Sequence, residues 1–165
     1  MKITTDTNVL ISSTFWSGDS DRILEKVENK EIELVLSKEI IEEFSKVLEY
    51  KEIKDKIKDK NLEMKRTVEK IISLSTIIVP SLKFNEIKED PSDNIILDCA
   101  VEGNVDFILS QDKHLLNLKE FRGIKIINPA DFLNLQFVKT EWVKNLLKKF
   151  LNKIFKTLFL HFSIM

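Results

Sequence analysis

Short apolar runs alternate with segments of helical periodicity along most of this chain. In segments between the strand-like runs, apolar residues recur at helical spacing. The clearest case is 37–50, where Ser37 is the predicted N-cap. The predicted strands are 2–5, 32–36, 77–79, 107–110 and 124–127. Strands that alternate with helices predict a parallel sheet with helices on both faces, so the predicted fold class is α/β.

The composition fits one domain of ordinary size. The chain has 165 residues, of which 43% are hydrophobic, enough for a core without disulfides or a structural metal. Its single cysteine, Cys99, lies in an apolar run and is predicted to be a small buried residue. No basic segment followed by an apolar one opens the sequence, so we predict a cytoplasmic protein.

Acidic residues stand where two of the predicted strands end. Asp6 ends the first strand, Asp112 follows the fourth, and Asp93 opens the helix between the third and the fourth. Ligands of open parallel sheets bind beyond the carboxyl ends of the strands, so these acids are expected to converge. Two carboxylates about 4 Å apart repel by roughly 4 kcal/mol at an effective dielectric constant of about 20. Either their pKa values rise or a cation lies between them.

Four short motifs occur in an order that resembles a known family. They are Asp-Thr-Asn-Val-Leu at 6–10, Ser-Lys-Glu-Ile-Ile-Glu-Glu-Phe at 37–44, Asp-Pro-Ser-Asp-Asn at 90–94 and Ser-Gln-Asp at 110–112. Together they resemble the PIN domain, in particular the PIN-type toxins of prokaryotic toxin–antitoxin pairs, over about residues 1–135.

The resemblance implies a fold, an activity and a set of site residues. It implies a three-layer α/β/α domain with strand order 3-2-1-4-5 and an endoribonuclease that uses Mg²⁺ or Mn²⁺ and hydrolyses RNA. It also implies a protein antitoxin as a possible partner and a homodimer. The catalytic and metal-binding acids carried over by motif are Asp6, Glu43, Asp93 and Asp112. The supporting residues are Asn8, Ser110 and, further from the ion, Asp90.

The chemistry of phosphodiester hydrolysis suits such a cluster of acids. The reaction needs neutralisation of charge on the phosphoryl oxygens and a water acidic enough to attack, and a divalent ion supplies both. Magnesium keeps several waters, so one or two carboxylates bind it directly and others hold its waters. No histidine belongs to the motifs, so we assign the steering of the attacking water to Asp93 or Asp112.

Each candidate residue also has an ordinary structural role open to it. Asp6, Asp93 and Asp112 could cap helices or turns, Asp90 could form the turn before Pro91, Asn8 could close a turn, and Ser110 could be an ordinary strand terminus. Glu43 competes with Glu39 and Glu42 on one helix. Asp98 is expected to satisfy a local hydrogen bond, and His114 and His161 lack the spacing of a zinc site.

Other acid-based α/β sites do not match. A haloacid-dehalogenase-type phosphatase needs a second aspartate where this chain has Asn8, a response-regulator receiver needs one after the third strand, and no P-loop is present. The remaining alternative to a nuclease is a catalytically inactive PIN-like scaffold that binds RNA or supports an assembly.

Residues 136–165 are a predicted extension with a charge of opposite sign. From 137 to 165 there are six lysines and one glutamate, a net +5, and since the whole chain carries −1, residues 1–136 carry −6. The pattern predicts a basic amphipathic helix whose lysines interrupt any membrane span. We expect its apolar face to pack on protein, with RNA or an anionic membrane as alternatives. The acidic body needs compensation to bind RNA, which we assign to metal ions, the lysines of 51–70 and the extension.

Overall fold

The computed structural model describes residues 1–57 and 64–136, with 138, 141, 143, 146–149 and 151 beyond them. The contacts divide the chain into two compact units, Met1–Ala130 and Asp131–Met165, which are described separately below. The predicted domain boundary at residue 135 stays a prediction.

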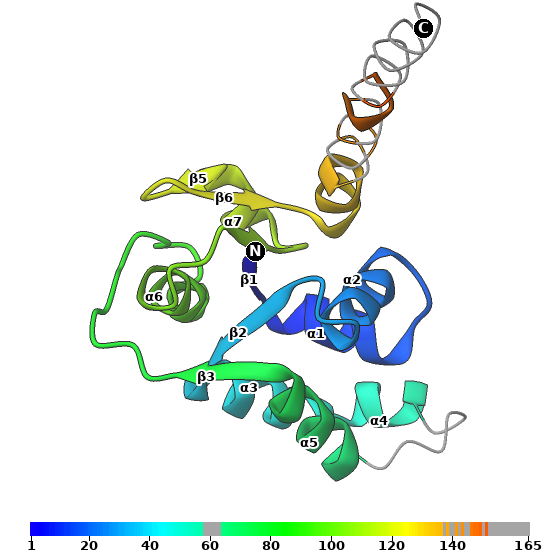
Figure 1. Cartoon of the computed structure of the whole chain (residues 1–165). Helices are drawn as coiled ribbons and strands as arrows, with labels where there is room; N and C mark the ends of the chain where they lie inside the picture. Colours follow the sequence, from blue (N-terminus) through cyan, green and yellow to red (C-terminus); the bar gives the residue numbers. More distant parts are fainter. Residues whose placement is uncertain are drawn as a thin grey trace, which may run out of the picture. The chain divides into compact units, whose positions relative to one another are not determined.

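The first unit is built on a six-stranded, mostly parallel sheet with the order β3-β2-β1-β4-β6-β5 (Figure 1). Its strands are β1 Lys2–Thr5, β2 Glu33–Ser37, β3 Ser75–Ile78, β4 Phe107–Leu109, β5 Glu120–Phe121 and β6 Ile124–Ile127. All pairs are parallel except β5 with β6. The predicted α/β class and order 3-2-1-4-5 are confirmed, because the fifth predicted strand is β6. The two-residue β5 was not predicted.

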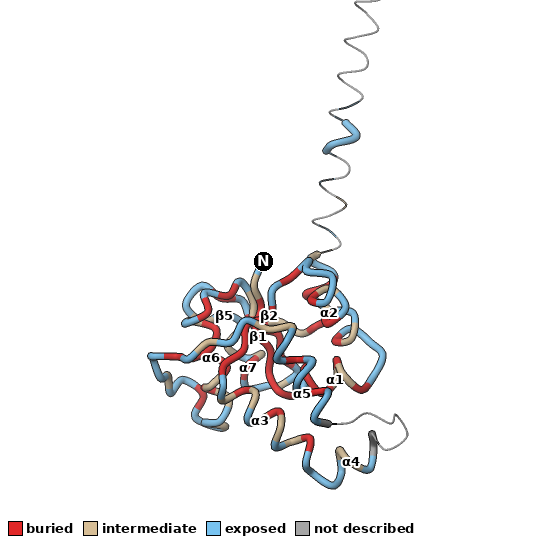
Figure 2. The backbone as a smooth tube through the Cα atoms, turned by 60° about the horizontal axis from the view of Figure 1, so that its bottom comes forward, coloured by how far each residue is buried: buried red, intermediate tan, exposed pale blue. Residues whose placement is uncertain are grey.

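Helices cover the sheet. They are α1 Thr7–Phe15, α2 Asp19–Glu28, α3 Lys38–Leu48, α4 Lys51–Ile57, α5 Met64–Leu74, α6 Asn94–Glu102 and α7 Lys113–Leu118, with the 3₁₀ turn η2 Pro91–Asp93 before α6. Helix α6 contacts β1 and β2, and Figure 1 shows it on one side of these strands, with the α1–α2 pair on the other. The buried residues run through the strands and the inner helix faces (Figure 2).

The sequence pattern located most elements but missed α1 and α7. Helix α1 exposes only Asn8 fully, because Val9, Leu10, Ile11 and Phe15 are all buried, and a periodic pattern cannot reveal a helix that is covered on most sides. Ser37 caps α3 as predicted, accepting a hydrogen bond from the Ile40 amide at 3.3 Å. The structure places α4 inside the segment predicted only as a charged stretch.

The end of α6 shows why a glycine is needed there. Gly103 follows α6 with an ordinary φ of −75°, and Asn104 takes the left-handed conformation with φ 48°. A Cβ on Gly103 would lie 2.7 Å from Cγ1 of Val35 and 3.1 Å from the carbonyl oxygen of Cys99. The close approach of β2 therefore explains why residue 103 is a glycine, and the left-handed Asn104 is where the helix ends.

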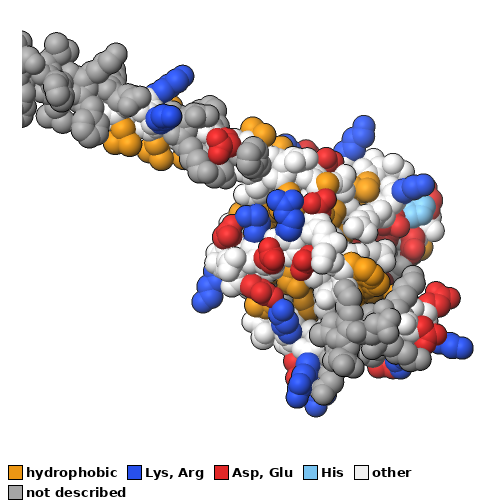
Figure 3. Space-filling view, turned by 90° about the vertical axis from the view of Figure 1, so that its right-hand side faces the viewer, with side chains coloured by type: hydrophobic (Ala, Val, Ile, Leu, Met, Phe, Trp, Pro, Cys, Tyr) orange, Lys and Arg blue, Asp and Glu red, His pale blue; other side chains and the backbone are white. Residues whose placement is uncertain are grey.

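The second unit is helical at all of its described positions. Phe132 and Leu133 are buried, whereas the described apolar side chains beyond residue 136 are exposed, from 43% to 65%. Figure 3 shows orange apolar side chains beside blue lysines on this segment. The exposed side chains are those of Val138, Val143, Leu146, Leu147 and Leu151. No helix in the described residues is long and apolar enough to cross a membrane. Most of the predicted basic amphipathic helix, including Trp142, Lys144 and residues 152–165, lies outside the described residues.

Candidate active site

The carboxyl ends of β1 and β4 bring two polar segments side by side. The strands are parallel neighbours, with Thr5 opposite Leu109, so the next residues, Asp6 and Ser110, leave the sheet together. The Asp6 amide donates to the carbonyl oxygen of Leu109 at 3.1 Å and extends the pairing by one residue. The predicted convergence at this edge therefore follows from the register of two strands.

Asp6 is almost fully buried and is held at both carboxylate oxygens. Its Oδ1 accepts the Val9 amide at 2.7 Å, which caps α1, and its Oδ2 accepts the Ser110 hydroxyl at 2.5 Å and the Gln111 amide at 3.0 Å. Burial raises the pKa of Asp6, and these hydrogen bonds offset part of the increase. The capping role and the site position thus coexist in one residue.

Ser110 joins Asp6 to Asp112. Its hydroxyl is fully buried, donates to Asp6 and accepts the Asp112 amide at 2.9 Å. Asp112 in turn caps α7 by accepting the His114 amide at 2.6 Å. One hydroxyl group therefore fixes the two acidic segments relative to each other.

Helix α3 carries three glutamates, and the structure separates their roles. Glu39 pairs with Lys83 at 3.3 Å, and Glu42 pairs with Lys38 at 3.1 Å on the exposed face. Glu43 is half-buried and makes no ion pair in the described part of the chain. Of the three, Glu43 is the one that faces the other acids.

The pKa of Glu43 is raised, in part by the neighbouring acids. Burial raises it, the Thr7 hydroxyl offsets part of the increase, and the charges of Asp6 and Asp90 raise it further. Although Thr7 lies beside Glu43, its buried hydroxyl makes no hydrogen bond of normal geometry.

Asp93 is the point where the acids meet. Its side chain caps no helix, and its buried Oδ2 has no hydrogen-bond partner. Burial raises its pKa to about 7, with further contributions from the charges of Asp112, Asp90, Asp6 and Glu43. The structure thus brings the four predicted acids together and adds Asp90 to the same electrostatic neighbourhood.

The other candidates lie at the margin of this cluster or outside it. Asp90 accepts hydrogen bonds from the amide and hydroxyl of Ser92, which lower its pKa. Asn8 is exposed on the first turn of α1. Asp98 lies elsewhere, as expected, because it accepts the Phe84 amide at 2.7 Å and pairs with Lys83 at 3.4 Å.

The comparison with protein families decides the identity of the fold. The pattern of the PIN domain matches residues 2–114, more than half of the chain. The chain belongs to the PIN-domain family. Members of this family are generally nucleases and typically use divalent metals. A search of curated proteins gave no match. The matched segment of this PIN domain runs from β1 to the start of α7 and contains all four acids.

The residues present fit a divalent ion that keeps much of its water. Within residues 1–57 and 64–136, no group of three or more His, Cys, Asp or Glu side chains is close enough to hold one ion together. Magnesium commonly binds through one or two carboxylates and retains several waters, so direct contact with three is not required. The feature that suits such an ion is the Oδ2 atom of Asp93, which has no hydrogen-bond partner in the described residues and lies near other carboxylates.

Three further groups act on the acids of the site and become visible only in three dimensions. The Gln111 amide and the Thr7 hydroxyl contact Asp6 and Glu43, and the charge of His114 lowers the pKa of Asp90. An amide donor carries no side-chain signal, whereas Thr7 could have been noticed as the residue that follows Asp6 at the start of α1.

Proposed function

We propose that this PIN domain is a Mg²⁺- or Mn²⁺-dependent endoribonuclease in which Asp6, Glu43, Asp93 and Asp112 bind the ion. The observation that carries the proposal is the buried Oδ2 of Asp93, which lacks a donor and lies among other carboxylates. Burying a carboxylate oxygen without a partner is unfavourable unless a cation or a donor compensates. A divalent ion provides that compensation.

The side chains have different roles in this proposal. When bound, the ion would neutralise charge on the phosphoryl oxygens and make a water more acidic. Asp6 is a rigid ligand, because three hydrogen bonds fix its carboxylate, and Ser110 positions Asp112 relative to it. Asp93 or Asp112 would steer the attacking water beside the ion.

Three lysines of 51–70 form ion pairs in the described part of the chain. Lys54 pairs with Glu49, Lys65 with Glu69 at 3.8 Å, and Lys70 with Glu28 at 2.6 Å. Exposed pairs of this kind contribute little free energy, so these lysines can exchange a carboxylate for a phosphate. Their part in RNA binding, beside that of the divalent ion, stays a proposal.

The test is cleavage of RNA in Mn²⁺ by four proteins, each measured with and without EDTA. We expect the wild type to cleave. Glu43→Gln should cleave about tenfold to a hundredfold more slowly, the usual effect of disturbing a metal site. The matched control is Glu42→Gln, the exposed neighbour on the same helix, which should cleave as the wild type does. Asp6→Asn should be as impaired as Glu43→Gln.

Two results would contradict the proposal. Cleavage that survives both Glu43→Gln and Asp6→Asn would mean that the acids are not the site. Absence of cleavage in every protein, across varied RNA substrates, would favour the inactive scaffold instead.

We also propose that the nuclease is the toxin of a toxin–antitoxin pair, which rests on the resemblance to PIN-type toxins. Induced expression in a bacterial host should then arrest growth, and Glu43→Gln should relieve the arrest while accumulating to the same level. Arrest by both proteins would contradict a toxic nuclease activity.

A further inference from the structure

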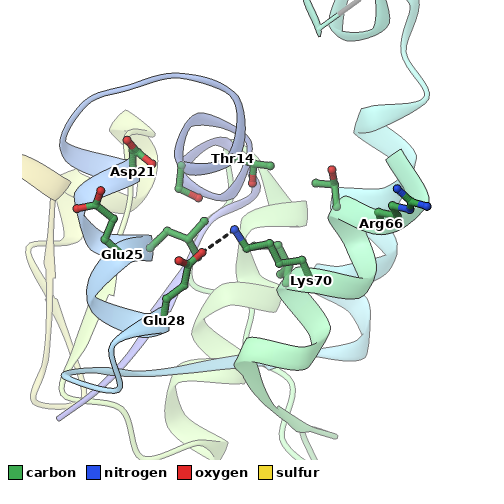
Figure 4. A pocket seen from close by; sticks show the side chains of 10 residues that line it. Thr14, Asp21, Glu25, Glu28, Arg66 and Lys70 are labelled. Atoms are coloured by element: carbon green, nitrogen blue, oxygen red, sulfur yellow. Dashed lines mark ion pairs between the residues drawn. The ribbon is translucent and has the colours of Figure 1, made fainter. Parts of the chain in front are cut away.

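A cavity lies between α1, α2 and α5, and none of the four acids lines it (Figure 4). Its volume is about 340 Å³. Ser13 and Thr14 line it from the last turns of α1, whereas Asp6 stands before the first turn of that helix. The cavity is therefore separate from the candidate active site, and its chemistry has to be explained separately.

The wall formed by α2 carries carboxylates without cationic partners. Asp21 and Glu25 are one helical turn apart and both line the cavity (Figure 4). The cations of α2 are engaged elsewhere, since Arg22 and Lys26 form ion pairs of 3.4 and 2.6 Å with carboxylates outside the cavity. In the described part of the chain no lysine or arginine pairs with either acid. Like charges at this spacing repel.

The opposite wall does not neutralise them. Lys70 reaches from α5 to Glu28 and forms an ion pair of 2.6 Å, which Figure 4 marks across the cavity. Arg66 also lines this wall and is engaged by an interaction of its own. The two cations of the cavity are thus already in use, and the acids of α2 remain available to a ligand.

The inner surface holds a buried hydroxyl with no partner. Thr67 is 3% exposed, lines the cavity, and its Oγ1 makes no hydrogen bond within the described residues. The hydroxyls of Ser13 and Thr14 both donate to the carbonyl of Leu10 at 2.8 Å, so toward the cavity they offer lone pairs. An unpaired buried hydroxyl is unfavourable, and a donor in the cavity would satisfy it.

We propose that this cavity binds a linear aliphatic polyamine. Its ammonium groups are placed against Asp21 and Glu25, whose Cβ atoms are about 5–6 Å apart at i, i+4 spacing, a separation that two amines joined by a few methylenes can match. Its methylenes lie on Leu24 and Ile71, the apolar lining residues. One of its N–H groups donates to Thr67. The cavity has more carboxylates than cations, hydroxyl oxygens that can accept hydrogen bonds, and an apolar strip. Such a lining favours a cationic ligand with several N–H donors.

The test is calorimetric titration of spermidine into the full chain. We expect 1:1 binding by the wild type, at least about tenfold weaker binding by Asp21→Asn/Glu25→Gln, and about tenfold weaker binding by Thr67→Val, the loss expected for a hydrogen bond to a charged group. The matched control is Asp19→Asn/Glu31→Gln, which removes two acids near the same helix but outside the cavity and should bind as the wild type does.

Spermidine should also raise the melting temperature of the wild type and the control, and not that of the cavity variant. Equal affinity in the cavity variant and the control would overturn the proposal and indicate general charge attraction. Loss of binding in Glu43→Gln would overturn it in favour of the candidate active site. Equally tight binding of Nα-acetyl-lysine amide, which keeps its ammonium group, would overturn the polyamine and indicate a basic side chain of a protein as the ligand. These outcomes do not depend on nuclease activity.

Discussion

Replacing Asp93 by asparagine should stabilise the protein in the absence of metal while abolishing its proposed activity. The pKa of Asp93 is about 7 in the folded protein, against an ordinary value of 3.8. An acid whose pKa is raised on folding binds its proton more tightly in the folded state, so stability falls as pH rises from about 4 to 7 and stays reduced above 7. Asparagine does not ionise and avoids this loss.

The magnitude follows from the two pKa values. The difference between about 7 and 3.8 corresponds to about 4 kcal/mol at 1.36 kcal/mol per pKa unit. Because the side chain is half-buried and water screens part of the repulsion, we expect a gain of about 2 kcal/mol for Asp93→Asn at pH 8.

The assay is urea denaturation in EDTA at pH 8 and at pH 5, with the free energy of unfolding obtained by linear extrapolation. The gain should be largest at pH 8 and clearly smaller at pH 5. Asp19→Asn, a surface acid paired with Arg22, is the control and should change stability by less than about 1 kcal/mol. A variant less stable than the wild type at pH 8, or a gain independent of pH, would refute the reasoning.

Three further predictions concern packing and hydrogen bonding. Ser110→Ala removes the buried hydroxyl that links two acidic residues and should lower the free energy of unfolding by about 2–4 kcal/mol, whereas Ser45→Ala, which loses only a local bond within α3, should lower it by about 1 kcal/mol or less. Gly103→Ala places a Cβ 2.7 Å from Cγ1 of Val35 and should lower the thermal midpoint, at a cost of about 1–3 kcal/mol. Burial raises the pKa of the Cys99 thiol to about 11, so iodoacetamide should label it at pH 8 only after unfolding in urea; rapid labelling of the native protein would contradict its buried position.

The sheet and the acidic cluster could be predicted from the sequence, because both follow from local rules. Apolar runs at the spacing of strands predict parallel pairing when helices separate them, and the residues after β1 and β4 then share one edge. The resemblance to the PIN domain selected Glu43 among the three glutamates of α3, and the structure shows Glu42 in an exposed pair with Lys38.

What could not be predicted depends on tertiary packing. Helix α1 is buried on most sides and exposes only Asn8 fully, so it lacks the broad polar face that a periodic pattern needs. The hydrogen bond from Ser110 to Asp6 requires the register of two strands and joins residues 104 positions apart in sequence. The cavity between α2 and α5 is likewise invisible in the sequence, because Thr67 resembles any polar residue of a surface helix until its burial is known.

The most direct test of the acidic site is calorimetric titration of Mn²⁺ at pH 7 in buffers of different ionisation enthalpy. Because the folded pKa of Asp93 is about 7, metal uptake should release a fraction of a proton, seen as a binding heat that varies with the buffer. We predict saturable uptake with proton release in the wild type, uptake at least about tenfold weaker and without that release in Asp93→Asn, and wild-type behaviour in Glu42→Gln. No uptake by the wild type, or equal uptake by Asp93→Asn, would contradict a metal site built from these acids.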